Sequence, residues 1–188
     1  FRKDFDALIT QGGTVRDLVS ESGAVAETQI TGPSNVDDGS LQGFELAYQQ
    51  TFDFLPAPFN ALGAQATYTY IDGGDLTGPE DQTQRSPFAD GLGFPGVSED
   101  TVNMVVFFED DAWSARLAYN WRSEFLITPR DDIFPFSPIV GNDTGQLDGS
   151  VFYNFNNVMN LENFKIGLQA VNLLDEVTQT SQIIDFDG

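Results

Sequence analysis

The chain has 188 residues, of which 29 are Asp or Glu and 8 are Lys or Arg, so its formal charge is −21. This acidity disfavours binding to nucleic acid, which depends on neutralising phosphates, and it also disfavours attraction to an anionic bilayer surface. The sequence has no Cys and no His, which excludes disulfides, thiolate chemistry, imidazole metal sites and Ser-His or Cys-His nucleophiles.

Taken in chain order, alternating apolar and polar residues predict about eight β-strands. They fall at residues 1–9, 24–31, 41–53, 62–71, 99–109, 113–124, 147–156 and 163–172. The nine prolines fall outside the alternating runs, as expected of strands that hydrogen-bond on both edges. No run of 18 apolar residues is present, so the sequence predicts no transmembrane helix.

The alternation is clearest in residues 113–123, where Trp113, Leu117 and Trp121 occupy one face of the strand. The two tryptophans are eight residues apart, which is about 27 Å of extended chain. In a strand tilted by roughly 40°, this length approaches the ~25 Å apolar band of an outer-membrane barrel. Residues 44–52, 62–70, 147–155 and 164–170 repeat the pattern, and their polar sides are rich in Gln, Thr, Asn and charge. A hydrated lumen would have such a lining.

The predicted connections fall into two length classes. Residues 54–61, 110–112 and 157–162 form short turns, whereas residues 11–23, 72–98, 125–146 and the tail 173–188 form long loops. The connection 31–40 is intermediate. Short turns on one side and long loops on the other are typical of an outer-membrane barrel.

Six motifs resemble, in order and spacing, the successive strand motifs of the C-terminal barrel of TonB-dependent outer-membrane receptors. They are GFELAYQQTF (43–52), YTY (68–70), FPGVS (94–98), ARLAYNWRS (115–123), LD (147–148) and AVNLLD (170–175). The resemblance implies an all-β fold, in which residues 1–188 form part of an antiparallel transmembrane β-barrel of about 22 strands. The plug domain and the closing strand of such a barrel are expected to lie outside this sequence.

The resemblance further implies a receptor and active transporter in the outer membrane of a Gram-negative bacterium, and not an enzyme. Its ligand would be scarce, such as an oligosaccharide or an iron chelate. Its other partners would be outer-membrane lipid and the TonB coupling protein, which is expected to contact an N-terminal part that this sequence lacks. We expect no cofactor and no nucleic acid.

Three sets of residues are candidates for function. The long loops carry the candidate ligand-binding residues Asp75, Asp81, Arg85, Phe88, Phe94, Arg130, Phe134 and Phe136. The polar faces carry the candidate lumen-facing residues Glu45, Arg116, Arg122, Asp148 and Lys165. The apolar faces carry the candidate membrane girdle of Phe44, Phe52, Tyr68, Tyr70, Trp113, Tyr119, Trp121, Tyr153, Phe155 and Phe164.

Simpler interpretations of the loop residues and of the lumen-facing residues remain open. The loop aromatics and carboxylates suit a sugar-binding surface, but the same composition suits an acidic loop that contacts nothing. The lumen-facing charges favour an ion-pair network over direct ligand contact. Asp72 and Asp75 could offer oxygen ligands to Ca²⁺, although the spacing of an EF-hand loop is absent. At the level of the whole chain, a passive outer-membrane channel and a soluble glycan-binding β-sandwich are the alternatives.

Overall fold

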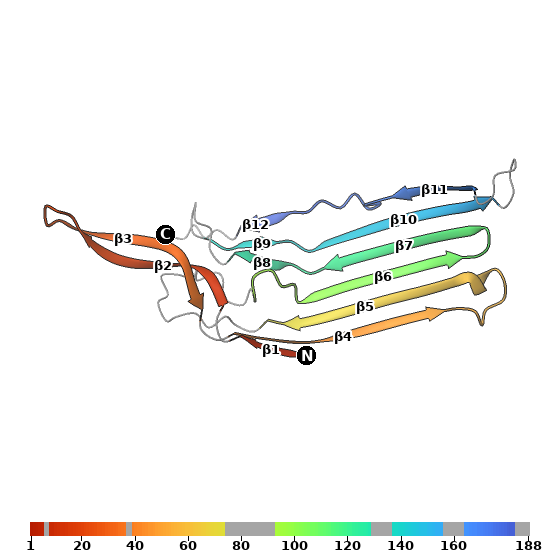
Figure 1. The fold of residues 1–188 in the computed structure, drawn as a ribbon, viewed down its shortest axis with the longest axis horizontal. Helices are drawn as coiled ribbons and strands as arrows, with labels where there is room; N and C mark the ends of the chain where they lie inside the picture. The colour runs from red at the N-terminus through yellow and green to blue at the C-terminus, as the bar shows by residue number, and fades with distance from the viewer. Residues whose placement is uncertain (6–7, 37–38, 74–92, 129–136, 156–163, 183–188) are drawn as a thin grey trace.

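The computed structural model describes residues 1–5, 8–36, 39–73, 93–128, 137–155 and 164–182, which form antiparallel β-strands (Figure 1). The predicted all-β, antiparallel class is therefore confirmed. The strands are β1 (Arg2–Phe5), β2 (Leu8–Val19), β3 (Val25–Val36), β4 (Gly39–Thr51), β5 (Leu62–Asp72), β6 (Asp100–Glu109), β7 (Trp113–Arg122), β8 (Phe125–Thr128), β9 (Ile139–Gly141), β10 (Thr144–Phe155), β11 (Phe164–Ala170) and β12 (Thr180–Gln182). One 3-10 turn, η1 (Phe59–Ala61), precedes β5. Within the described ranges, no helix is long and apolar enough to cross a membrane.

Seven strands form one sheet in the order β1-β4-β5-β6-β7-β10-β11, with every neighbouring pair antiparallel. The aromatic and β-branched residues that alternate along these strands fit a pleated surface, which explains why the segments are extended. The intervening strands β2, β3, β8 and β9 add no strand to this sheet but form two smaller sheets. The sheet therefore follows the chain up and down, as the sequence predicts.

Three short strands after β7 lie in segments that the sequence predicts to be loops. β8, β9 and β12 form a sheet in the order β12-β9-β8, which continues β7, β10 and β11 at one end (Figure 1). The prediction of loops at 125–146 and 173–188 is therefore wrong for residues 125–128, 139–141 and 180–182. These strands have three or four residues each, too few for an alternating pattern to stand out, and they form because a partner strand is available.

Two strand pairs near the N-terminus, β1 with β4 and β2 with β3, have the same register, and the sequence analysis divided these strands incorrectly. The pair Phe5–Gly39 of β1 and β4 is followed, three residues along each chain, by Leu8–Val36 of β2 and β3, so the second strand pair keeps the register of the first. Residues 11–19 and 32–36, predicted as loops, are thus paired strand. Gly12, Gly13 and Pro33 make these segments look like loops, but Pro33 is tolerated because a two-stranded ribbon leaves one edge of β3 free of hydrogen bonds.

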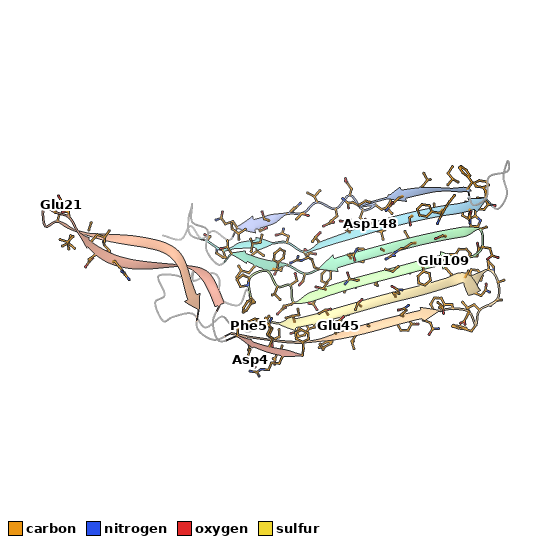
Figure 2. All side chains as sticks on the ribbon, viewed as in Figure 1. Asp4, Phe5, Glu21, Glu45, Glu109 and Asp148 are labelled. Atoms are coloured by element: carbon orange, nitrogen blue, oxygen red, sulfur yellow. The ribbon has the colours of Figure 1, made fainter. Side chains whose placement is uncertain are left out.

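The tip of the β2–β3 hairpin is a compact turn at residues 20–24. Ser20 N–H donates to the Ala24 carbonyl over 2.9 Å, and Gly23 N–H donates to the Ser20 carbonyl over 2.9 Å. Gly23 has φ of +78°, a left-handed conformation that favours glycine. Figure 2 places Glu21 at the outer tip, far from the seven-stranded sheet.

The ends of the sheet differ, as the turn lengths predict. The β4–β5 connection and the β6–β7 turn lie at one end, and the β2–β3 hairpin extends from the other (Figure 1). Asp110 tightens the β6–β7 turn, because its Oδ1 accepts hydrogen bonds from Ala112 N–H at 2.8 Å and Trp113 N–H at 2.6 Å. We call these the turn end and the hairpin end.

The few buried side chains gather at the hairpin end. Phe94, Leu126 and Val140 are 7%, 1% and 6% exposed, and Gly96 N–H donates to the Leu126 carbonyl over 2.7 Å. Elsewhere the described part of the sheet is a single layer, so its large apolar side chains are exposed. The described strands therefore do not bury enough apolar surface to form an ordinary hydrophobic core.

Candidate functional site

One face of the seven-stranded sheet is predominantly apolar from β4 to β11. Residues directly opposite one another in an antiparallel pair share a face, and the register places Phe44 opposite Tyr70, Met104 opposite Tyr119 and Val151 opposite Leu168. The middle of this apolar face is open to its surroundings, because Leu46 is 62% exposed, Leu117 51% and Leu168 77%. A contiguous exposed apolar surface of this kind marks an interaction with a membrane or with another protein.

Two rows of aromatic rings border the apolar face. At the turn end, the ring centroids of Trp113 and Tyr153 are 4.7 Å apart, those of Tyr153 and Phe155 4.6 Å, and those of Phe155 and Phe164 5.8 Å. Phe52 lies at the same end, with its ring 6.0 Å from that of Phe54.

The second row lies towards the hairpin end. The Phe44 ring is 5.8 Å from Tyr68 and 5.6 Å from Tyr70, and Tyr119 and Trp121 continue the row on β7. The Tyr68 hydroxyl donates a hydrogen bond of 2.5 Å to the Asp100 carboxylate, so the polar tip of this ring is satisfied. All ten residues predicted for the girdle thus fall in two rows separated by aliphatic side chains.

The opposite face of the sheet is polar. Thr67, Asn103, Asn120 and Gln146 are directly opposite one another on β5, β6, β7 and β10, and they form a row of hydroxyl and amide groups across the sheet. The neighbouring row runs from Glu45 through Thr69, Thr101 and Arg122 to Thr144. All five predicted lumen-facing residues lie on this polar face.

The expected ion-pair network among these five residues is absent: none of them pairs with another of the set in the described structure. The register explains why, because Asp148 is opposite Ala118, Lys165 is opposite Asn154 and Glu45 is opposite Thr69. Figure 2 also places Glu45 and Asp148 on strands far apart in the sheet, β4 and β10.

Two of the three predicted lumen-facing cations lie over aromatic rings. The Arg122 Cζ is 3.7 Å from the centroid of the Phe125 ring, and its Nε donates to Ser98 Oγ over 3.0 Å. The Lys165 Nζ is 4.6 Å from the centroid of the Phe152 ring. These cation–π contacts hold the side chains of Arg122 and Lys165 against the sheet.

Phenylalanine rings lie over glycines on this face, an arrangement that the sequence analysis missed. A Cβ on Gly63 would come within 2.6 Å of the Phe107 ring, one on Gly167 within 2.6 Å of Phe152, and one on Gly141 within 2.7 Å of Phe125. Each glycine is directly opposite its ring in the sheet. The signal available in the sequence was a glycine inside an alternating strand, which indicates close approach of another group.

Asp148 joins two of the motifs on which the family resemblance rests. Its Oδ1 accepts a hydrogen bond of 2.9 Å from Asn172 N–H and another of 2.9 Å from Gln146 Nε2. Asn172 has φ of +57°, and its side chain bonds both the N–H and the carbonyl of Glu176, at 2.8 and 2.9 Å. The carboxylate therefore fixes the turn that follows β11.

We expect Asp148→Ala to loosen this turn, because Asn172 N–H loses its acceptor. A protease that cleaves at apolar residues, added to the receptor in membranes, should then cut near Leu173 and Leu174 several-fold faster. Asp148→Asn keeps an acceptor oxygen and should be cut at nearly the original rate. Equal cleavage of the Asp148→Ala variant and the unchanged protein would contradict this role.

Of the predicted ligand-binding loop residues, the structure describes Phe94. Its ring is buried and lies 5.7 Å from the Phe5 ring, at the base of the hairpin end. The other seven lie outside the described residues: Asp75, Asp81, Arg85, Phe88, Arg130, Phe134 and Phe136.

The described part of the chain holds no group of three acidic side chains arranged for a metal ion. Of the two carboxylates considered for Ca²⁺, Asp72 accepts a hydrogen bond of 3.0 Å from Gln42 Nε2. Asp75 lies outside the described residues.

Comparison with known proteins gives one match. The family model described as "TonB dependent receptor-like, beta-barrel" matches residues 1–173. No curated protein and no solved structure matches the chain.

Proposed function

Because the chain belongs to the TonB-dependent receptor β-barrel family, whose members are outer-membrane receptors and transporters, we propose that it forms part of the wall of an energy-coupled uptake receptor. The ligand would be a scarce solute, an oligosaccharide or an iron chelate, and the energy would come through the TonB protein. The family is not one of enzymes. Residues 1–188 would supply consecutive strands of the barrel and their extracellular connections.

The observation that carries this proposal is the pairing of an apolar face, bordered by two aromatic rows, with a polar face on the other side of the same strands. From Trp113 to Trp121, β7 spans about 27 Å. Tilted by roughly 40°, it would span about 21 Å of height, close to the ~25 Å apolar band of an outer-membrane barrel. The aromatic rows would then lie at the two interfaces of the bilayer, and the rows of Thr, Asn and Gln would line the water-filled interior.

The two ends of the sheet give the proposed orientation. Outer-membrane barrels have short periplasmic turns and longer extracellular loops. The turn end, with Asp110–Ala112, would accordingly face the periplasm, and the β2–β3 hairpin would extend outside the cell. First contact with the ligand is then expected at the hairpin end.

The test is an uptake assay on the complete receptor. The protein should fractionate with the outer membrane and change its gel mobility on heating, as a closed barrel does. Cells expressing it should take up one member of a panel of oligosaccharides and ferric chelates, and the uptake should stop when TonB is removed. Uptake that persists without TonB would instead indicate a passive channel, and a protein that is soluble without detergent would overturn the membrane assignment.

A further inference from the structure

One row on the polar face combines a partly exposed aromatic ring with a guanidinium group that has no partner among the described residues. Going across the sheet, directly opposite residues are Thr51, Gly63, Phe107, Arg116, Ser150 and Gln169, from β4 to β11. Neighbouring strands are about 4.8 Å apart, so the row places these groups in close succession along a line across the wall.

The Phe107 ring leans over Gly63 of β5, whereas Arg116 lies on β7, on the other side of β6. Two atoms of the ring lie 2.6 and 2.8 Å from where a Cβ on Gly63 would be, so the ring covers the bare backbone of β5. Phe152 and Phe125 cover glycines in the same way, but a cation lies over each of them. Among the described residues no cation lies over Phe107, whose side chain is partly exposed.

Arg116 is the cation of this face that has no described partner. Its side chain is exposed and makes no hydrogen bond or ion pair with any described residue. Asp148, on the adjacent strand, is already bonded to Asn172 and Gln146. The guanidinium is therefore free to bind an anion, and its planar donors suit a carboxylate.

From these groups we infer that the row is a binding site for an acidic saccharide, in which the C–H face of a sugar ring covers Phe107 and the carboxylate of a uronic acid pairs with Arg116. Ser150 and Gln169, which follow Arg116 in the row, can both donate to and accept from sugar hydroxyls. The inference rests on the proposed function, since it takes the polar face to line the interior of the barrel. It narrows the transported ligand to a sugar that carries negative charge.

Binding to the complete receptor in detergent tests the inference, with a trimer of galacturonic acid as probe and a trimer of galactose as its neutral match. The receptor should bind the acidic trimer more tightly. Arg116→Gln should weaken binding of the acidic trimer about tenfold or more, which is the scale of one charged hydrogen bond, and should leave the neutral trimer unaffected. Lys165→Gln removes a charge from the same face and should change neither affinity.

A matched pair of variants tests the role of the Phe107 ring in binding. Phe107→Leu should weaken binding of the acidic trimer several-fold, whereas Phe152→Leu, which removes a ring already covered by Lys165, should not. Heat-dependent gel mobility of each variant shows whether the barrel is intact. Equal effects of the two substitutions in intact barrels would overturn the role of Phe107.

A third measurement asks whether the site is accessible. The 188 residues contain no cysteine, so Ser150→Cys introduces a single thiol within this part of the chain. A charged maleimide should label it in intact membranes, and the acidic trimer should slow the labelling.

An unlabelled thiol would mean that another segment covers the row, and it would overturn the inference. So would failure of the receptor to bind the acidic trimer. A receptor that imports some other ligand through TonB but is insensitive to Arg116→Gln would refute this inference alone. A protein that does not reach the outer membrane would refute the proposed function as well.

Discussion

Leu117→Arg is expected to destabilise the folded barrel by about 2–4 kcal/mol, the cost of an arginine on the lipid face near the bilayer midplane. Leu117 lies on β7 midway between Trp113 and Trp121, and its side chain is 51% exposed on the apolar face. An arginine there would place its charge in the hydrocarbon core of the bilayer, far from water and from the interfaces that the aromatic rows mark. Urea unfolding of the complete receptor in lipid bilayers measures the difference.

The next residue along the strand provides the control. Ala118 lies on the polar face, opposite Val105 and Asp148, so an arginine introduced there would point into the proposed lumen beside a carboxylate. Ala118→Arg should therefore cost much less than Leu117→Arg. If Ala118→Arg is the more harmful of the two, the apolar face is the inner one and the assignment of lipid and lumen is reversed.

Gly43→Ala is expected to cost about 1–3 kcal/mol of stability through overpacking. A Cβ at this position would overlap the backbone carbonyl oxygen of Tyr70 and come within 3.1 Å of the Ile71 Cα, both on the paired strand β5. The backbone cannot move aside without disturbing the β4–β5 ladder. The same unfolding measurement, or the temperature at which gel mobility changes, detects the loss.

Gly63→Ala is the matched comparison. The added methyl group would meet the side chain of Phe107 instead of backbone, and a ring can rotate away. We expect Gly63→Ala to cost less than Gly43→Ala, and its cost to fall further when Phe107→Leu is introduced with it. A Gly43→Ala variant as stable as the unchanged protein would show that the two strands are not held as closely as the structure indicates.

Which side chains share a face of a strand could be predicted directly from the sequence. Trp113, Leu117 and Trp121 share a face because successive residues of a strand point to opposite sides, and this property needs no knowledge of the partner strand. The antiparallel class and the turns at 54–61 and 110–112 were predictable for the same reason, since they depend on local alternation and on turn residues.

The strands that depend on their partners were not predictable. Residues 11–19 and 32–36 contain Gly12, Gly13 and Pro33 and have poor strand propensity, yet they lie in the paired strands β2 and β3, whose register matches that of β1 and β4. β8, β9 and β12 are likewise short segments held by neighbours. Contacts across a sheet override weak local preference.

The composition of the polar face was also local information, but the pairing of its charges was not. The sequence by itself determined which side chains share a face, that one face is apolar and bordered by aromatic residues, and which family the chain resembles. Only the tertiary structure decided which residues lie opposite one another, because register is fixed by the whole set of strand pairings. That register places Asp148 opposite Ala118, places Arg122 and Lys165 over phenylalanine rings, and leaves Arg116 opposite Phe107 with no partner among the described residues.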